Sequence, residues 1–141
     1  MSVGSDPSRN GIEVLSEQQC RELLASQDLG RIAFSIDDQP EIFPVNYAAD
    51  GTVVVFRTAS DNRLQQAVLR RVAFEVDGWD SNTTVAWSVV VKGVAEDVTT
   101  GIDPFSAALR ERQVFPLAPG LREHWIAVYP SEVSGRRFRR L

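Results

Sequence analysis

Polar and apolar residues alternate along several short stretches of this chain. In residues 31–36, the apolar residues Ile32, Phe34 and Ile36 are separated by polar or small ones. A period of two indicates a strand with one buried face. The same alternation, or a run rich in β-branched residues, predicts further strands. They cover residues 41–47, 52–58, 72–76, 84–97 and 125–129, and the last extends from Val133 after Pro130.

Helical patterns are confined to the start of the chain and to two connections. Ser16 and Gln19 form a capping box that predicts a helix over about residues 17–26, and Gly30 is expected in the turn that ends it. Ser60 or Asp61 is expected to cap a short helix through about Leu69. Asp103–Pro104 is expected to open another.

Most predicted strands are joined by turns, such as Asp37–Pro40 and Asp50–Gly51, that are too short for a βαβ series. We therefore expect a mainly β fold, an antiparallel barrel that is closed or partly closed. Residues 1–11 are rich in Ser, Gly, Asp and Pro and read as a mobile arm. Residues 12–141 are expected to form a single domain.

Composition narrows the classes of partner. A net charge of -4 over 141 residues argues against nucleic acid. One cysteine (Cys20) and one histidine (His124) exclude an intrachain disulfide and make a zinc site improbable, so no metal is expected. The sequence has no run long enough to cross a membrane and no visible signal peptide, so a cytoplasmic protein is expected.

Three segments carry candidate chemistry. The segment 56–64 runs from a strand end through a hydroxyl-rich turn into a helix start, with Arg57 and Arg63 on either side. Such a place suits a phosphate, although a capped helix with two exposed arginines has the same pattern. Pro44 interrupts the strand 41–47, which indicates an unpaired edge, a bulge or a ligand. Trp87 and Ser88 place an aromatic ring beside a hydroxyl, a pattern that core packing also explains.

These segments, in this order, resemble the pyridoxamine 5′-phosphate oxidase-like flavoproteins of the FMN-binding split-barrel fold. The resemblance spans roughly residues 29–97, with a weaker match in the tail at 134–137. It is carried by Leu29-Gly30-Arg31-Ile32-Ala33, Phe43-Pro44-Val45-Asn46-Tyr47, Phe56-Arg57-Thr58, Val72-Ala73-Phe74-Glu75-Val76-Asp77 and Trp87-Ser88-Val89-Val90-Val91-Lys92-Gly93.

The resemblance implies a Greek-key split barrel that forms a homodimer with FMN at the subunit interface. Carried over by position, the isoalloxazine ring would lie along Phe43, Pro44, Val45 and Asn46, largely on their backbone. The phosphate would meet Arg57, Thr58, Asn62 and Arg63. Trp87 and Ser88 would approach from the other subunit, and Arg137 is a candidate to close the site.

The same resemblance implies an FMN-dependent oxidoreductase that transfers hydride to or from a small conjugated substrate. The true oxidases carry a basic residue where this chain has Asn46, and a basic pair where it has only Arg63 after Asn62. No catalytic residue is assigned. Tyr47 is a possible donor near the ring, although a tyrosine at a strand end usually serves packing. No histidine is expected in the barrel strands. The alternatives are a reductase that binds the deazaflavin F420, a non-catalytic flavin carrier or sensor, and a dimeric interaction module that has lost cofactor binding.

Overall fold

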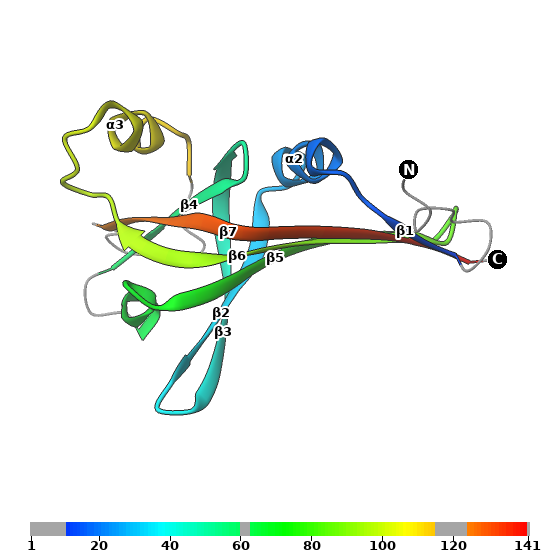
Figure 1. Ribbon diagram of the computed structural model, residues 1–141, viewed down its shortest axis with the longest axis horizontal. Helices are drawn as coiled ribbons and strands as arrows, with labels where there is room; N and C mark the ends of the chain where they lie inside the picture. Colours follow the sequence, from blue (N-terminus) through cyan, green and yellow to red (C-terminus); the bar gives the residue numbers. More distant parts are fainter. Residues whose placement is uncertain (1–10, 60–62, 115–123, 141) are drawn as a thin grey trace.

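The computed structural model describes residues 11–59, 63–114 and 124–140. In chain order the elements are β1 (Ile12–Val14), α2 (Glu17–Ala25), β2 (Leu29–Ile36), β3 (Gln39–Asp50), β4 (Val53–Thr58), the 3₁₀ helix η1 (Arg63–Ala67), β5 (Arg71–Asp80), β6 (Val85–Asp97), α3 (Pro104–Arg110) and β7 (His124–Arg139) (Figure 1). All the predicted strands are present, so the mainly β prediction is confirmed. The predicted arm, apart from Gly11, lies outside the described residues.

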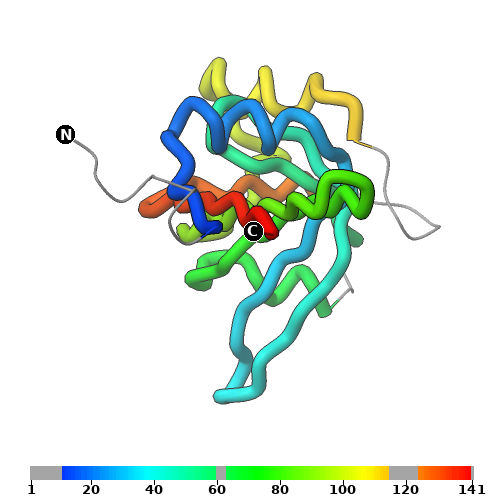
Figure 2. The backbone as a smooth tube through the Cα atoms, turned by 90° about the vertical axis from the view of Figure 1, so that its right-hand side faces the viewer, coloured from blue at the N-terminus to red at the C-terminus, as the bar shows by residue number. Residues whose placement is uncertain are grey.

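The strands form one antiparallel sheet that closes on itself. Its order is β1-β7-β4-β3-β2-β5-β6, and β6 pairs again with β7 to complete the ring. The order β4-β3-β2-β5 is a Greek key, because β5 returns to the free side of β2 after two hairpins. Both α2 and α3 lie on one side of the long β6–β7 ribbon, and the tip of the β2–β3 hairpin projects on the other (Figures 1 and 2).

The start of the chain follows local rules of helix capping. The Ser16 hydroxyl accepts from the Gln19 backbone N–H, and the Gln19 side chain accepts from the Ser16 N–H in return. This confirms the predicted capping box and holds the first turn of α2. Gly30, however, is not in the turn after α2. It lies inside β2 opposite Val45. Glycine is needed there because the Phe74 ring packs so close that an added Cβ atom would lie 2.3 Å from it.

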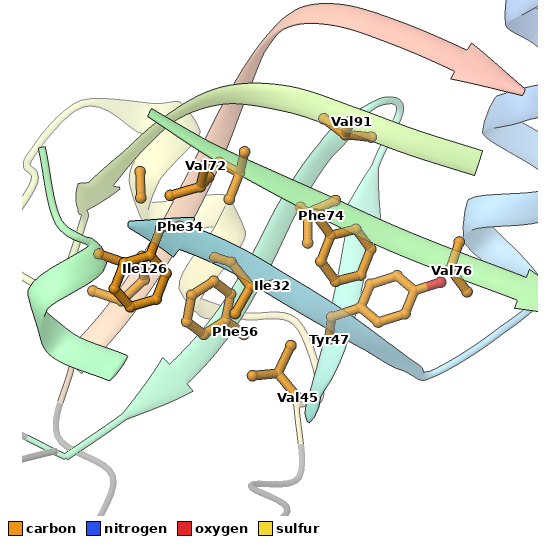
Figure 3. Close-up of a cluster of buried hydrophobic side chains, with 14 of the residues drawn as sticks. Ile32, Phe34, Val45, Tyr47, Phe56, Val72, Phe74, Val76, Val91 and Ile126 are labelled. Atoms are coloured by element: carbon orange, nitrogen blue, oxygen red, sulfur yellow. The ribbon is translucent and has the colours of Figure 1, made fainter. Parts of the chain in front are cut away.

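The barrel interior holds the main hydrophobic core (Figure 3). The Tyr47 ring packs edge-on against Phe74 with centroids 4.7 Å apart, and its hydroxyl donates to the Leu24 carbonyl at 2.6 Å. Tyr47 is only 3% exposed. Of the two interpretations of Tyr47, a packing role agrees with this position: its hydroxyl joins β3 to α2 inside the protein. A second cluster under α3 includes Val55, Leu109 and Ala127.

The connection between β4 and β5 differs from the predicted one. The predicted helix through about Leu69 is only the five-residue 3₁₀ helix η1. Its expected caps, Ser60 and Asp61, lie outside the described residues. The helices that the structure describes, α2 and α3 included, are all too short or too polar to cross a membrane.

Candidate functional site

The barrel is split where β3 and β4 separate. β3 pairs with β4 only over Tyr47–Asp50, whereas Arg57 and Thr58 at the end of β4 pair with β7 instead. Residues Gln39–Val45 of β3 therefore have β2 as their one strand partner in the described structure. We call this segment the β3 free edge. The edge position predicted from Pro44 is confirmed, and backbone N–H and C=O groups on this side of the strand are left without strand partners.

Side chains on the β3 free edge alternate between two faces. Phe43 and Val45 point inward: Val45 is 5% exposed, and the Phe43 ring stacks on Phe34 with centroids 5.9 Å apart. Pro44 and Asn46 lie on the opposite face, opposite Arg31 and Leu29 of β2. Phe43 and Val45 can therefore offer a ligand mainly their backbone, as the resemblance implied.

The end of β4 places Arg57 and Thr58 beside the split. The Arg57 guanidinium lies over the Trp125 ring of β7, 5.0 Å from its centroid. This stacking leaves the charge of the guanidinium intact while it restrains the side chain. Thr58 is 1% exposed, and its hydroxyl contacts the Ala59 carbonyl at 3.4 Å. Of this predicted pair, Thr58 is therefore buried and Arg57 is partly exposed.

Arg63 spans the split to the β3 free edge. Its Nε and Nη2 atoms donate to the two carboxylate oxygens of Glu41 at 2.9 and 3.1 Å. The hydrogen bonds from Arg63 hold the pKa of Glu41 below its usual value against the opposing effect of desolvation. Glu41 was not among the predicted site residues, and Asn62 lies outside the described residues.

A histidine–aspartate pair lies at the same end of the barrel. His124 is the first residue of β7, opposite Thr58, and its Nδ1 atom is 2.6 Å from the carboxylate of Asp97. The expectation that the barrel strands contain no histidine is therefore wrong. Partial burial raises the pKa of Asp97, but hydrogen bonds from Thr99 and the contact with His124 outweigh it and leave the pKa lowered.

The third predicted group lies elsewhere on the sheet. Trp87 and Ser88 belong to β6, which is separated from β3 by β2 and β5. The Trp87 indole packs on Gly78, where an added Cβ atom would lie 2.4 Å from Nε1. With Arg137 it lines a hollow of about 410 Å³. The Arg137 guanidinium is 3.1 Å from the Glu13 carboxylate.

The structure therefore divides the predicted site into two parts. One part is the β3 free edge with Arg57 and Arg63, and the other is the β6–β7 surface with Trp87, Ser88 and Arg137. In the strand order, β2 and β5 lie between the two parts. A flat ring with polar edges fits the free backbone groups of the first part, and a phosphate fits its two guanidinium groups. The described residues include no cluster of three metal-ligating side chains.

This architecture is that of a split β-barrel. A family model described as pyridoxamine 5′-phosphate oxidase matches residues 16–137, and the chain belongs to this family. An uncharacterized protein of Mycobacterium tuberculosis (strain ATCC 25618 / H37Rv) is 32% identical over 139 residues, which cover 94% of this chain and 90% of that protein.

Two solved structures are similar over nearly their whole length. One is an FAD binding protein from Mycobacterium smegmatis, 37% identical, with a TM-score of 0.75 over 90% of this chain and 98% of the other. The second is a conserved protein of unknown function from Corynebacterium diphtheriae, 30% identical, with a TM-score of 0.73 over 92% and 99% of the two chains.

Proposed function

We propose that this protein is a flavin-dependent oxidoreductase that binds its flavin along the β3 free edge. The observation that carries the proposal is the split itself: the segment Gln39–Val45 of β3 has a paired strand on one side only among the described residues, and Arg57 and Arg63 lie at the split. When bound, a flavin would supply hydride transfer to or from a small conjugated substrate. The chain's own part is to hold the ring on backbone groups and the phosphate on guanidinium groups.

Two flavins meet these requirements. FMN is the cofactor that the family resemblance implied, and the similar protein from Mycobacterium smegmatis is described as binding FAD. Both carry the same ring and a phosphate at the same position of the ribityl chain. The described contacts of Arg57 and Arg63 suit this shared part of the two molecules.

We also propose that two copies of the chain complete the site. Paired residues on β2, β5 and β6 form a continuous outer face, and its central rows contain Arg31, Ala33, Ala73, Glu75, Val90 and Lys92. The β3 free edge adds Ile42, which is 66% exposed, at the border of this face. A second copy on this face would cover exposed apolar surface. It would also bring its own Trp87 and Ser88 towards the β3 free edge, from which β2 and β5 separate them within one chain.

Absorption spectroscopy tests the cofactor. The purified protein is incubated with FMN, FAD or F420 and then desalted. We expect a retained flavin band with FMN or FAD, whereas retention of F420 alone would favour the deazaflavin reductase. Arg57→Gln should weaken binding of the phosphate-bearing flavins by about tenfold, because a charge-assisted hydrogen bond is lost. Arg21→Gln is the matched control, since it removes an arginine whose ion pair with Glu17 lies on α2.

Turnover tests the reaction. The flavin-loaded protein is reduced and offered a panel of conjugated acceptors under anaerobic conditions. Oxidation by at least one acceptor at a rate above that of free reduced flavin would support an oxidoreductase. Oxidation by oxygen alone would identify a non-catalytic flavin carrier or sensor. Failure to retain any cofactor would contradict the proposed function.

A further inference from the structure

A hollow of about 740 Å³ lies between the β2–β3 hairpin and the paired strands β6 and β7. A volume of this size is typical of sites for small organic ligands. Pro40 and Glu41, which belong to the β3 free edge, form part of its wall. A ligand in this hollow would therefore lie directly beside the proposed flavin site.

Arg70, which directly precedes β5, is held in place in the wall of this hollow. Its backbone N–H donates to the Ala67 carbonyl at 3.0 Å, and its own carbonyl accepts from the Ala95 N–H at 3.2 Å. Its Nε atom donates to the Gln66 carbonyl at 2.7 Å, and Nη1 makes a longer contact with the Ser35 carbonyl at 3.4 Å. Carbonyl oxygens orient a guanidinium without cancelling its charge. Arg70 is therefore a preorganised cation.

The charged side chains in the wall leave an excess of positive charge. Three cations and two carboxylates line the hollow, with a formal charge of +1: Arg70, Arg71, Lys92, Glu41 and Glu132. Arg63, the partner of Glu41, and Asp37, which acts on Arg63, add one charge of each sign and leave this balance unchanged. Lys92 is the partner of Glu132, at 3.8 Å. Among the residues that the structure describes, neither Arg70 nor Arg71 has a carboxylate within ion-pair distance, so the excess charge lies on these two.

We propose that this hollow is the substrate site of the oxidoreductase and that it selects a conjugated acid, whose carboxylate binds Arg70 with support from Arg71. This inference rests on the proposed function, because the hollow borders the flavin site. Ala33, Val72 and Ala73 also line the hollow and would contact the uncharged, planar part of such a molecule. Ala33 and Ala73 lie in the central rows of the outer face, so a second copy packed there would cover the hollow and exclude water from it.

Two ligands that differ in charge test the inference. trans-Cinnamate is a conjugated acid, and trans-cinnamamide has the same planar skeleton without the charge. Their dissociation constants are measured by isothermal titration calorimetry for the wild type, Arg70→Gln, Arg71→Gln and Arg21→Gln, each with and without bound flavin. Arg21→Gln is the control, because it removes an arginine on α2 whose ion pair with Glu17 lies outside the hollow. A thermal melt checks the fold of each protein, and Arg71→Gln keeps the test open should the carbonyl contacts of Arg70 prove necessary for folding.

We expect the wild type to bind cinnamate about tenfold or more tightly than cinnamamide. Arg70→Gln should weaken cinnamate binding by about tenfold and Arg71→Gln by about threefold, because each removes a cation, while cinnamamide affinity stays constant. Cinnamate should also shift the visible absorption bands of the bound flavin, and the control should match the wild type.

Three results would overturn the inference while flavin binding stands: equal affinity for the two ligands, an unchanged preference in both hollow variants, or cinnamate binding that leaves the flavin bands unchanged. Failure to retain any flavin would instead overturn the proposed function, and the substrate role with it, whatever the flavin-free protein binds.

Discussion

Tyr47 stands at the border between the core and the β3 free edge, and the structure assigns its hydroxyl to the core. Burial raises the pKa of Tyr47 well above its usual value, so the phenol stays protonated and donates to the Leu24 carbonyl. We predict that Tyr47→Phe lowers the free energy of unfolding by about 1–2 kcal/mol, because the buried carbonyl loses its donor. Flavin affinity and the rate of flavin oxidation should stay at wild-type values. A loss of activity without a loss of stability in urea denaturation would instead indicate that the Tyr47 hydroxyl acts in the flavin site.

Gly30 is required by packing across the sheet. An added Cβ atom would lie 2.3 Å from the Phe74 ring and 2.9 Å from the Glu75 carbonyl. We predict that Gly30→Ala lowers the free energy of unfolding by about 1–3 kcal/mol, because a well-packed ring and a backbone strand must both shift. Urea denaturation measures the effect. Gly51→Asn is the control: Gly51 has φ +60° with open space around it, and asparagine tolerates that backbone conformation. An equal loss in both variants would contradict this explanation.

Single residues also show which features of the site could be predicted from the sequence and which could not. Pro44 has a local consequence, the loss of a backbone donor, and it correctly predicted an unpaired edge. The pairs Glu41–Arg63 and Asp97–His124 join positions 22 and 27 residues apart. No local sequence pattern predicts either pair, because the two residues of each pair are brought together by the strand register of the closed barrel. His124 could have been suspected only from its place directly before an apolar strand.

Among the elements, those with strong local patterns were predicted best. The alternation in residues 31–36 and the apolar run around Val89–Val91 gave the right strands. Boundaries were less accurate, because partners across the sheet extend a strand beyond its apolar centre. β7 runs through Pro130 as far as Arg139, since β6 pairs with it over nearly its whole length. The segment after Arg57 was predicted as a longer helix than η1, because capping residues do not fix how far a helix continues.

Helix α2 is the clearest case of an element set by local sequence. Its capping box satisfies two backbone N–H donors, those of Ser16 and Gln19, and the buried Cys20 and Leu24 pack α2 against the barrel. We predict that Ser16→Ala lowers the free energy of unfolding by about 1 kcal/mol, because the N–H of Gln19 loses its acceptor. Ser16→Asp should restore stability, since aspartate also caps helices. Chemical denaturation of the three proteins measures this, and an alanine variant as stable as the wild type would contradict it.

On the scale of the whole molecule, the outer face predicts the state of assembly. Ile42 and Ile102 are both strongly exposed, at 66% and 99%, but only Ile42 borders the outer face; Ile102 lies between β6 and α3. We predict a dimer in light scattering and a monomer for Ile42→Glu, because a buried carboxylate at the border of the interface is costly. Ile102→Glu should stay dimeric. A wild-type monomer, or equal behaviour of the two variants, would contradict the proposed dimer.

Glu75 makes the stability of the molecule depend on pH. Burial and the neighbouring Asp77 raise the pKa of Glu75 to about 7, although Arg31 at 3.1 Å acts in the opposite direction. Unfolding returns this pKa to its usual value of 4.5. Between these two values the folded chain binds more protons than the unfolded chain, so the free energy of unfolding contributed by Glu75 is present below pH 4.5 and falls as pH rises towards 7.

We therefore predict that the wild type loses about 1–3 kcal/mol of stability from this residue between about pH 4.5 and 7. Glu75→Gln should remove this slope, because glutamine does not titrate; the lost ion pair with Arg31 changes the level of the curve and not this part of its slope. Urea denaturation at half-unit intervals of pH measures the difference. Glu132→Gln, which removes an exposed carboxylate near Lys92, should keep the wild-type slope. Because Glu75 lies at the centre of the outer face, a second copy packed there would favour the protonated form further, so the dimer should dissociate more readily as pH rises through 7. Parallel pH profiles for the wild type and Glu75→Gln would show that Glu75 is ionised in the folded protein throughout this range.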